Sequence, residues 1–278
     1  MEDYAIHNKT LRKLVSIVYN SDIYNYVSKK FNEFRDIKSI DQIKKNPVPE
    51  HVAVIMDGNR RFASSLGLSP EVGHQFGRDK IKEVLEWCFE LGIKNLTIYA
   101  FSTENFNRSS NEVKTLMDLC KEELKKAFND SRIHKNKVRI RIIGRLDTLP
   151  KDIATQAKNI MDQTEHYDEY SFNIALAYGG REEIIQAIQK IAKDVKSGKV
   201  KIEDIKESIV SKYLYTNGIP DPDIILRTSG EERLSNFLLW QLAYSELYFS
   251  DVYWPAFQKK DFLNAIKTVQ QRQRRYGK

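Results

Sequence analysis

The chain has 278 residues, an apolar fraction of 41%, a charged fraction of 30% and a net charge of +7. This composition is typical of an ordinary globular protein with a sizeable core and excludes wholesale disorder. No apolar run approaches the roughly 20 residues that span a bilayer, and the acidic N-terminus lacks the basic start and apolar block of a signal peptide. We therefore expect a cytoplasmic protein, with peripheral membrane contact left open, and the positive charge favours anionic partners.

The first 45 residues are rich in Lys, Asn and Tyr, and apolar side chains recur at helical spacing between Leu11 and Tyr19. The proline-containing segment 46–49 then breaks the chain. This pattern predicts an N-terminal helical extension over residues 1–45 and a main domain over residues 46–278. Contact with a membrane surface and packing against the main domain are both open for the extension.

Six short apolar runs in the main domain have the length and β-branched content of buried strands. These runs are 52–56, 96–101, 138–143, 172–177, 224–226 and 247–252. Amphipathic helical patterns lie between them, at 81–89, 113–124 and 184–195. The alternation predicts an α/β fold, in which a single domain has a central, mostly parallel six-stranded sheet flanked by helices.

Polar side chains directly follow four of the predicted strands. The segments are 57–61, 102–105, 178–181 and 227–231. Ligands of open parallel sheets bind outside the carboxyl ends of the strands. We therefore expect one shared polar pocket at this edge.

The first of these segments begins with Asp57 and Gly58, which mark a tight turn from a strand to a helix. Taken alone, Asp57 is typical of a helix N-cap. However, Arg60 and Arg61 place positive charge in the first helical turn, which is unfavourable for the helix dipole unless an anion binds there. Because Gly58 also lets the backbone approach a ligand, the segment predicts a diphosphate site.

Segment 227–236 is a second candidate phosphate site. Arg227 and Arg233 supply guanidinium groups next to hydroxyls and a glycine, which suit phosphate oxygens. A polar turn with an N-cap at Ser235 is the alternative interpretation. Two phosphate sites at one edge indicate two phosphorylated substrates.

A divalent cation is expected between two such sites. Asp57 and Glu246 are the candidate oxygen ligands, because Mg²⁺ binds one or two carboxylates together with substrate phosphates and water. The sequence contains no GxxxxGK[ST] loop, no GxGxxG fingerprint and no adjacent pair of Asp residues. A P-loop nucleotidase, a dinucleotide enzyme and the paired-Asp metal site of trans-prenyltransferases are thereby disfavoured.

Five segments resemble, in the same order, the signature motifs of cis-prenyltransferases, the family of undecaprenyl and dehydrodolichyl diphosphate synthases. These segments are 51–61, 73–77, 99–108, 178–181 and 227–241. The resemblance implies condensation of isopentenyl diphosphate units onto an allylic diphosphate, farnesyl or geranylgeranyl diphosphate. The implied product is a long-chain Z-polyprenyl diphosphate, the precursor of a glycosyl-carrier lipid. It also implies Mg²⁺ as cofactor and a homodimer.

The resemblance assigns roles to individual positions. Asp57 and Asn105 match catalytic residues, and Asp57 and Glu246 match carboxylates linked to the metal. The positions that match the allylic site are Gly58, Asn59, Arg60, Arg61, Phe62 and His74. Those that match the loop over the reacting centre are Ser102, Thr103, Glu104, Phe106 and Arg108. The isopentenyl site is matched by Arg227, Arg233, Leu234 and Ser235. A C-terminal element that reaches a neighbouring subunit is matched by Arg275 and Gly277.

Some positions depart from the family pattern. Pro70 stands where bacterial members often place a phosphate-binding arginine, and Arg60 stands where they usually have glycine, so that Arg60 is expected to compensate. The proton acceptor of the reaction stays undecided. The helices at 81–89 and 113–124 have apolar faces suited to a tunnel for the growing chain, and plain core packing is the open alternative.

Two other functions compete with this one. A non-catalytic subunit of a two-subunit prenyltransferase would share the fold but lose the aspartate–arginine loop, whereas Asp57, Asn105, Arg227 and Arg233 are all present. A nucleic-acid-binding module would need basic residues interleaved with aromatic ones on a surface. Because the basic residues here converge on diphosphate-like loops, we expect no nucleic-acid partner.

Overall fold

The computed structural model describes residues 36–272. Contacts divide the chain into two units, Met1–Asn46 and Pro47–Lys278. Residues 36–44 of the first unit are helical; most of the predicted N-terminal extension lies outside the described residues and stays a prediction. None of the helices within residues 36–272 combines the length and the apolar character needed to cross a membrane.

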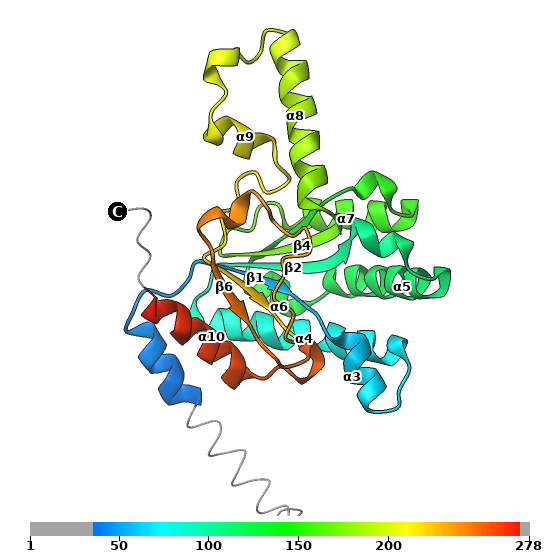
Figure 1. Ribbon diagram of the computed structural model, residues 1–278, viewed down its shortest axis with the longest axis vertical. Helices are drawn as coiled ribbons and strands as arrows, with labels where there is room; N and C mark the ends of the chain where they lie inside the picture. The colour runs from blue at the N-terminus through cyan, green and yellow to red at the C-terminus, as the bar shows by residue number, and fades with distance from the viewer. Residues whose placement is uncertain (1–35, 273–278) are drawn as a thin grey trace, which may run out of the picture. The chain divides into compact units, whose positions relative to one another are not determined.

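Six parallel strands form one sheet in the order β3-β4-β2-β1-β5-β6 (Figure 1). The strands are β1 (His51–Ile55), β2 (Asn95–Ser102), β3 (Val138–Ile143), β4 (Tyr170–Tyr178), β5 (Ile224–Arg227) and β6 (Glu246–Phe249). Every pairing between neighbours is parallel. The predicted six-stranded α/β fold is confirmed, and each predicted run overlaps one strand.

Helices connect the strands and cover the sheet. The α-helices are α3 (Asn59–Ser65), α4 (Pro70–Leu91), α5 (Ser110–Ala127), α6 (Ser131–Lys135), α7 (Lys151–Thr164), α8 (Gly180–Lys196), α9 (Glu207–Tyr213) and α10 (Lys259–Gln271). The 3₁₀ turns are η1 (Thr103–Asn107), η2 (Leu146–Thr148), η3 (Ile202–Asp204), η4 (Gln241–Tyr244) and η5 (Trp254–Ala256). The three amphipathic patterns predicted from the sequence lie in α4, α5 and α8. Figure 1 shows α8 extending away from the sheet.

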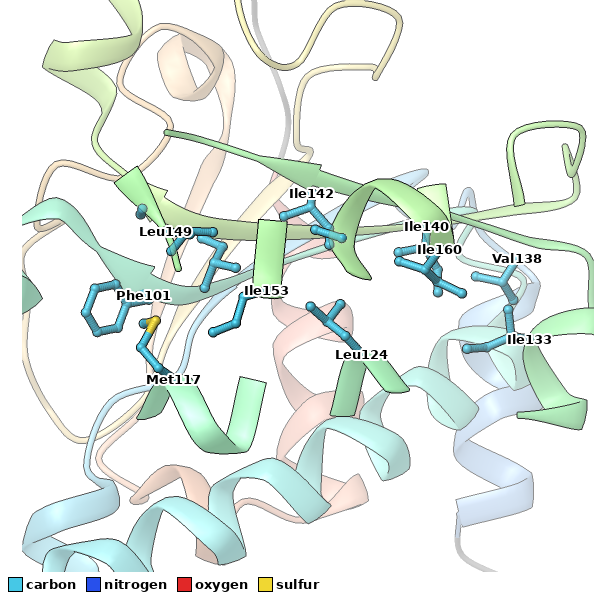
Figure 2. Close-up of a cluster of buried hydrophobic side chains, with 13 residues drawn as sticks. Phe101, Met117, Leu124, Ile133, Val138, Ile140, Ile142, Leu149, Ile153 and Ile160 are labelled. Atoms are coloured by element: carbon cyan, nitrogen blue, oxygen red, sulfur yellow. The ribbon is translucent and has the colours of Figure 1, made fainter. Parts of the chain in front are cut away.

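Apolar side chains cover both faces of the sheet, because successive residues of a strand point in opposite directions. Ile142 belongs to a cluster that includes side chains of α5 and α7, whereas Ile143 belongs to a second cluster with Phe237 and Leu238. Figure 2 shows the first cluster, in which Met117 lies beside Phe101. A sheet buried on both faces explains why the strands are continuous apolar runs.

One polar group is buried among these strands. The ring of His51, at the start of β1, contacts the Pro220 carbonyl through Nδ1 at 2.6 Å and the Thr97 hydroxyl through Nε2 at 2.7 Å. The amide of Asn173 donates to the same Thr97 hydroxyl at 3.1 Å. Burial lowers the pKa of His51 to about 4, against a smaller opposing effect of the Pro220 hydrogen bond. The imidazole is therefore neutral at pH 7.

The order of the strands determines where a ligand can bind. From β1 the chain moves first to β2 on one side, and it later crosses to β5 on the other side. This reversal beside β1 is a topological switch point, and in open α/β sheets ligands bind outside the carboxyl ends of the strands at such points. Asp57 lies at this position, two residues after β1.

Candidate active site

The carboxyl ends of β1 and β5 hold Asp57 from two sides. Ile55 pairs in register with Arg227, and the Arg227 guanidinium donates to Asp57 Oδ2 at 2.7 Å. The next residue, Thr228, holds the backbone of Asp57: its hydroxyl accepts from the Asp57 N–H at 2.9 Å and donates to the Asp57 carbonyl at 2.7 Å. Both the side chain and the backbone of Asp57 are thereby fixed.

The second carboxylate oxygen of Asp57 is also engaged. Oδ1 accepts from the Gly58 N–H at 2.7 Å and from Arg61 at 3.2 Å. Burial alone would raise the pKa of Asp57, but the hydrogen bond and charge of Arg227, together with Gly58 and Arg61, hold this pKa below its usual value. Asp57 is therefore an anion at neutral pH, surrounded by donors.

Gly58 is required at the turn between β1 and α3. Its φ of 102° lies in the left-handed region, and a Cβ there would be 2.8 Å from Tyr253 Cδ1 and 2.9 Å from Ser229 Cβ. Gly58 is also the N-cap residue of α3, without a side-chain hydrogen bond. Asp57 is therefore not the N-cap residue of α3, and the alternative interpretation is wrong.

The two predicted phosphate sites lie side by side. Arg61, from the first site, contacts Glu231 Oε1 at 2.9 Å, and Arg233, from the second, contacts the other oxygen of Glu231. Arg61 also donates to the Ser229 hydroxyl. Arg227 completes the arrangement by donating to the Ser235 hydroxyl at 2.9 Å. Glu231 thus pairs with one arginine from each of the two segments.

A second carboxylate contacts three side chains that line the site. Glu112, in the first turn of α5, contacts Arg108 at 2.7 Å, His74 at 3.4 Å and Arg60 at 3.6 Å. Burial lowers the pKa of His74, and Glu112 opposes this effect only in part. The result is a neutral imidazole beside two arginines that face the same pocket.

These side chains surround a polar pocket of about 350 Å³. It is lined by Met56, Asp57, Gly58, Asn59, Arg60, Arg61, His74, Arg108, Glu231 and Arg233. A cavity of about 230 Å³, lined mainly by apolar side chains, lies between the sheet and helices α4 and α5. Met56, Asn59 and His74 line both spaces, so the polar pocket adjoins the apolar cavity. The cavity is lined by Ile81 and Leu85 of α4 and by Leu116, Met117, Cys120 and Leu124 of α5, within the predicted segments.

The loop after β2 brings further predicted residues to this edge. The Asn105 side-chain carbonyl accepts from the Ser102 N–H at 3.1 Å and caps η1, which includes Thr103. Glu104 accepts from the Asn236 amide at 3.0 Å. The aromatic ring of Phe106 packs on Phe101, 4.9 Å between centroids. Phe62 meets Phe76 edge-to-face in the allylic segment at 5.9 Å, and Leu234 packs against the second core cluster.

Glu246 is not near Asp57 within one chain. It pairs in register with Ile224, three residues before Arg227. It therefore lies roughly 10 Å back along the strands from the level of Ile55 and Arg227, with Asp57 two residues beyond that level, and two strand spacings, each of roughly 4.8 Å, to the side. Its carboxylate contacts Arg272 at 3.0 Å. Within one chain, Asp57 and Glu246 therefore cannot bind the same ion. Binding of one ion by Asp57 of one copy and Glu246 of a second copy stays a prediction.

The donor set at Asp57 fits a metal ion that is shared with a substrate. Within residues 36–272, no group of three or more His, Cys, Asp or Glu side chains could enclose an ion. Mg²⁺ does not need such a cage, because it retains waters and binds phosphate oxygens beside one carboxylate. Asp57 is 28% exposed at the mouth of the arginine-lined pocket. It could supply that carboxylate once a diphosphate has taken over its arginine partners.

The sequence interpretation missed several residues of this site. Glu112, Thr228 and Glu231 contact predicted residues, and Asn236 joins two loops, yet none was assigned a role. Glu112 looks like an ordinary acidic residue at a helix start, and Glu231 like part of a polar turn. Arg275 and Gly277 lie outside the described residues.

The chain is similar in sequence to known proteins. Residues 55–277 match the sequence model of the undecaprenyl diphosphate synthase family. A tritrans,polycis-undecaprenyl-diphosphate synthase (geranylgeranyl-diphosphate specific) from Picrophilus torridus is 49% identical, over 92% of this chain and 99% of its own length. The enzyme of the same name from Methanopyrus kandleri is 52% identical, over 86% of this chain and 88% of its own.

Solved structures agree with these relatives. Lavandulyl diphosphate synthase from Lavandula x intermedia, crystallised with dimethylallyl diphosphate, superposes with a TM-score of 0.78 and 36% identity, over 83% of this chain and 99% of its own. A probable undecaprenyl diphosphate synthase from Campylobacter jejuni gives a TM-score of 0.68 and 35% identity, over 84% and 100% of the two chains.

Proposed function

The chain belongs to the undecaprenyl diphosphate synthase family, and from that membership we infer that it is a cis-prenyltransferase. It condenses isopentenyl diphosphate units onto an allylic diphosphate and releases a long-chain Z-polyprenyl diphosphate. The names of the relatives from Picrophilus torridus and Methanopyrus kandleri specify geranylgeranyl diphosphate, which favours this starter over farnesyl diphosphate. The product would serve as the precursor of a glycosyl-carrier lipid.

The observation that carries this proposal is the junction of the polar pocket with the apolar cavity. A polyprenyl diphosphate has one charged end and one long hydrocarbon tail. The arginines around Asp57 match the charged end, and the cavity between the sheet and helices α4 and α5 matches the tail. The three residues that line both spaces would surround the carbon next to the diphosphate.

The side chains of the site can support this reaction. The bond between C1 of the allylic substrate and its diphosphate oxygen breaks, which leaves an allylic cation and a diphosphate anion. Arg60, Arg61 and Arg108 would stabilise the developing negative charge, because preorganised donors favour the state in which charge has formed. The isopentenyl double bond then bonds to C1, and loss of a proton creates the new double bond.

Mg²⁺ is proposed as the cofactor, with Asp57 as its protein ligand. When bound, it would neutralise charge on the departing diphosphate. Asp57 would be released from Arg227 and Arg61 when substrate oxygens replace it as their partner. Glu246 could contribute only from a neighbouring chain.

A homodimer is proposed as the assembly. Ile185 and Ile188 on the projecting helix α8, and Ile202 on the following turn, are all more than half exposed. Exposed apolar side chains gathered on one projecting element are typical of a protein–protein contact.

The chain leaves the described region at Arg272, which contacts Glu246 at the amino edge of the sheet. A C-terminal element with Arg275 and Gly277 that serves a partner's site is part of this proposal. Peripheral membrane contact of the N-terminal extension also stays a proposal.

Activity is tested with the purified full chain, labelled isopentenyl diphosphate and either geranylgeranyl or farnesyl diphosphate, with Mg²⁺ or excess EDTA. Reversed-phase chromatography then resolves the products by length. We expect long products with Mg²⁺, more with the geranylgeranyl starter, and none in EDTA. Absence of any elongated product under all conditions would refute the proposed function.

A further inference from the structure

We propose that Asn236 is a positioning residue that joins the two substrate loops through its hydrogen bond to Glu104. One of these loops is the reacting-centre loop, residues 102–108 after β2. The other is the isopentenyl loop, residues 227–236 after β5. This inference rests on the proposed function, because it concerns how the two substrates of that reaction are held against each other.

The amide of Asn236 connects three strand ends. Its Nδ2 donates to Glu104 Oε1 at 3.0 Å, on the reacting-centre loop. Its Oδ1 accepts from the Arg181 N–H at 2.9 Å, in the first turn of α8 after β4. The Asn236 backbone carbonyl accepts from the Gly180 N–H at 2.7 Å. The end of the isopentenyl loop is thus attached to the ends of β2 and β4.

The backbone of the loop directs this side chain inward. Ser235 and Asn236 both have positive φ angles, of 48° and 64°. Asn is among the few residues besides glycine that adopt this conformation readily. Ser235 in turn accepts from Arg227, which holds Asp57. A shift of Asn236 would therefore be transmitted through Ser235 and Arg227 to the reacting centre.

The contact also accounts for the Gly179–Gly180 pair, which has no role in the proposed chemistry. Gly179 has a φ of −154°, an ordinary extended value, so its backbone angle does not require glycine. Space does: a Cβ on Gly179 would be 2.8 Å from Asn236 Nδ2 and 2.9 Å from Thr103 Oγ1. A Cβ on Gly180 would be 2.8 Å from Leu239 Cγ and 3.1 Å from the Asn236 carbonyl. Gly179 thus leaves room for the Asn236 side chain, and Gly180 leaves room for the backbone of residues 236–239.

The hydrogen bond between Asn236 and Glu104 should affect the rate of the bond-forming step, because it holds the two substrate loops in place. Carbon–carbon bond formation needs the reacting atoms within about 3–3.5 Å, and a misplacement of about 1 Å can lower the rate on the order of a hundredfold. Asn236 lines neither the polar pocket nor the apolar cavity. Weakening its bond to Glu104 should therefore lower kcat more than it raises either KM.

The test reverses the polarity of this hydrogen bond. Asn236→Asp keeps the shape and still accepts from the Arg181 N–H, but it turns a carboxylate toward Glu104. The Glu104 carboxyl is ionised. Burial raises its pKa, but the hydrogen bonds from its own N–H, Asn236 and Ser102 together outweigh burial, so that the pKa lies below its usual value. We expect Asn236→Asp to lower kcat about tenfold or more with both KM values within about threefold. Adding Glu104→Gln supplies an amide that donates to the new carboxylate at position 236, so that kcat of the double variant should return to within about threefold of Glu104→Gln alone.

Asn236→Gly is the matched control, because it accepts the positive φ and removes both side-chain hydrogen bonds. Its loss of kcat should not be restored by Glu104→Gln. The positioning role of Asn236 would be refuted by a wild-type kcat in Asn236→Asp. It would also be refuted if Asn236→Asp lost the same factor in kcat with and without Glu104→Gln. If the wild-type chain does not elongate any starter, the proposed function fails instead. The same cycle is then read in the free energy of unfolding, where absence of coupling between positions 236 and 104 would overturn the contact itself.

Discussion

At the scale of single residues, the site depends on one carboxylate that is held entirely by donors. We expect Asp57→Asn to lower kcat about 10²–10³-fold, because it removes the charge that organises Arg227 and Arg61 and that would bind the metal. Single-turnover assays with saturating substrates would measure this loss. Arg227 is only 3% exposed, and in Asp57→Asn the amide oxygen at position 57 still accepts its hydrogen bond. The fold of the variant should therefore persist.

The control for this variant is Asp152→Asn on α7. Asp152 also pairs with a cation, Lys121 at 2.5 Å, but the pair is about half exposed and neither residue lines the polar pocket. Its removal should change neither kcat nor the melting temperature by much. Near-normal turnover of Asp57→Asn would remove Asp57 from its catalytic role.

A second prediction at this scale concerns the buried His51. Its pKa is about 4 in the folded chain, against about 6.5 when unfolded. Between these values the unfolded chain binds more protons, so the free energy of unfolding should fall as pH is lowered from about 6.5 to 4, by about 3 kcal/mol in all. Urea unfolding at a series of pH values would measure this slope.

His51→Gln should flatten the slope in this window, whatever its own cost in stability. The exposed His166 offers the comparison: His166→Gln should leave the slope unchanged. An unchanged slope in His51→Gln would show that other groups cause the acid sensitivity.

At the scale of elements, helices α4 and α5 both cover the sheet and line the apolar cavity. This cavity lies between the helices and the strands. We expect Cys120→Trp, which adds bulk inside this cavity, to shorten the polyprenyl product, because the growing tail meets the indole ring. Chromatography of the products against those of the wild type would reveal the change in length.

Asp118→Trp is the matched control for added bulk, since Asp118 lies on the same helix with its side chain 62% exposed. It should leave the product length unchanged. Overpacking can cost about 1–3 kcal/mol, so both variants need a melting temperature beside the product analysis. Unchanged product length in a folded Cys120→Trp would exclude this cavity as the tail site.

The elements themselves were largely predictable. The predicted strands and the helices α4, α5 and α8 follow from local periodicity, and each is found. The predicted last strand, 247–252, ends earlier at Phe249, because the backbone of Ser250, Ser229 and Gly230 is used in the turns that flank the site. Helices α6, α7 and α9 were not predicted individually.

At the scale of the whole molecule, the proposed dimer depends on the projecting helix α8. Ile188 is 57% exposed there. We expect Ile188→Glu to shift the chain from dimer to monomer, because a charge cannot be buried in an apolar contact without a partner. Sedimentation equilibrium would measure the molar mass.

Asn159→Glu on α7 adds the same charge at another exposed position and should leave the mass unchanged. Both variants should still unfold in one cooperative thermal transition, although loss of association can lower the melting temperature of Ile188→Glu. A dimer that survives Ile188→Glu would place the contact elsewhere.

The sequence by itself determined the class of fold and the sheet, and it singled out residues that the structure brings together around the polar pocket. Strand and helix patterns repeat within a few residues, and Asp57, Arg61, Arg227 and Arg233 stand in motifs that are recognisable without any distant partner. Only the tertiary structure decided which carboxylates meet which arginines. Glu231 reaches Arg61 across 170 positions, and Glu246 lies at the opposite end of the strands from Asp57. Strand order and register set these distances, and both arise from packing between segments that are far apart in the chain.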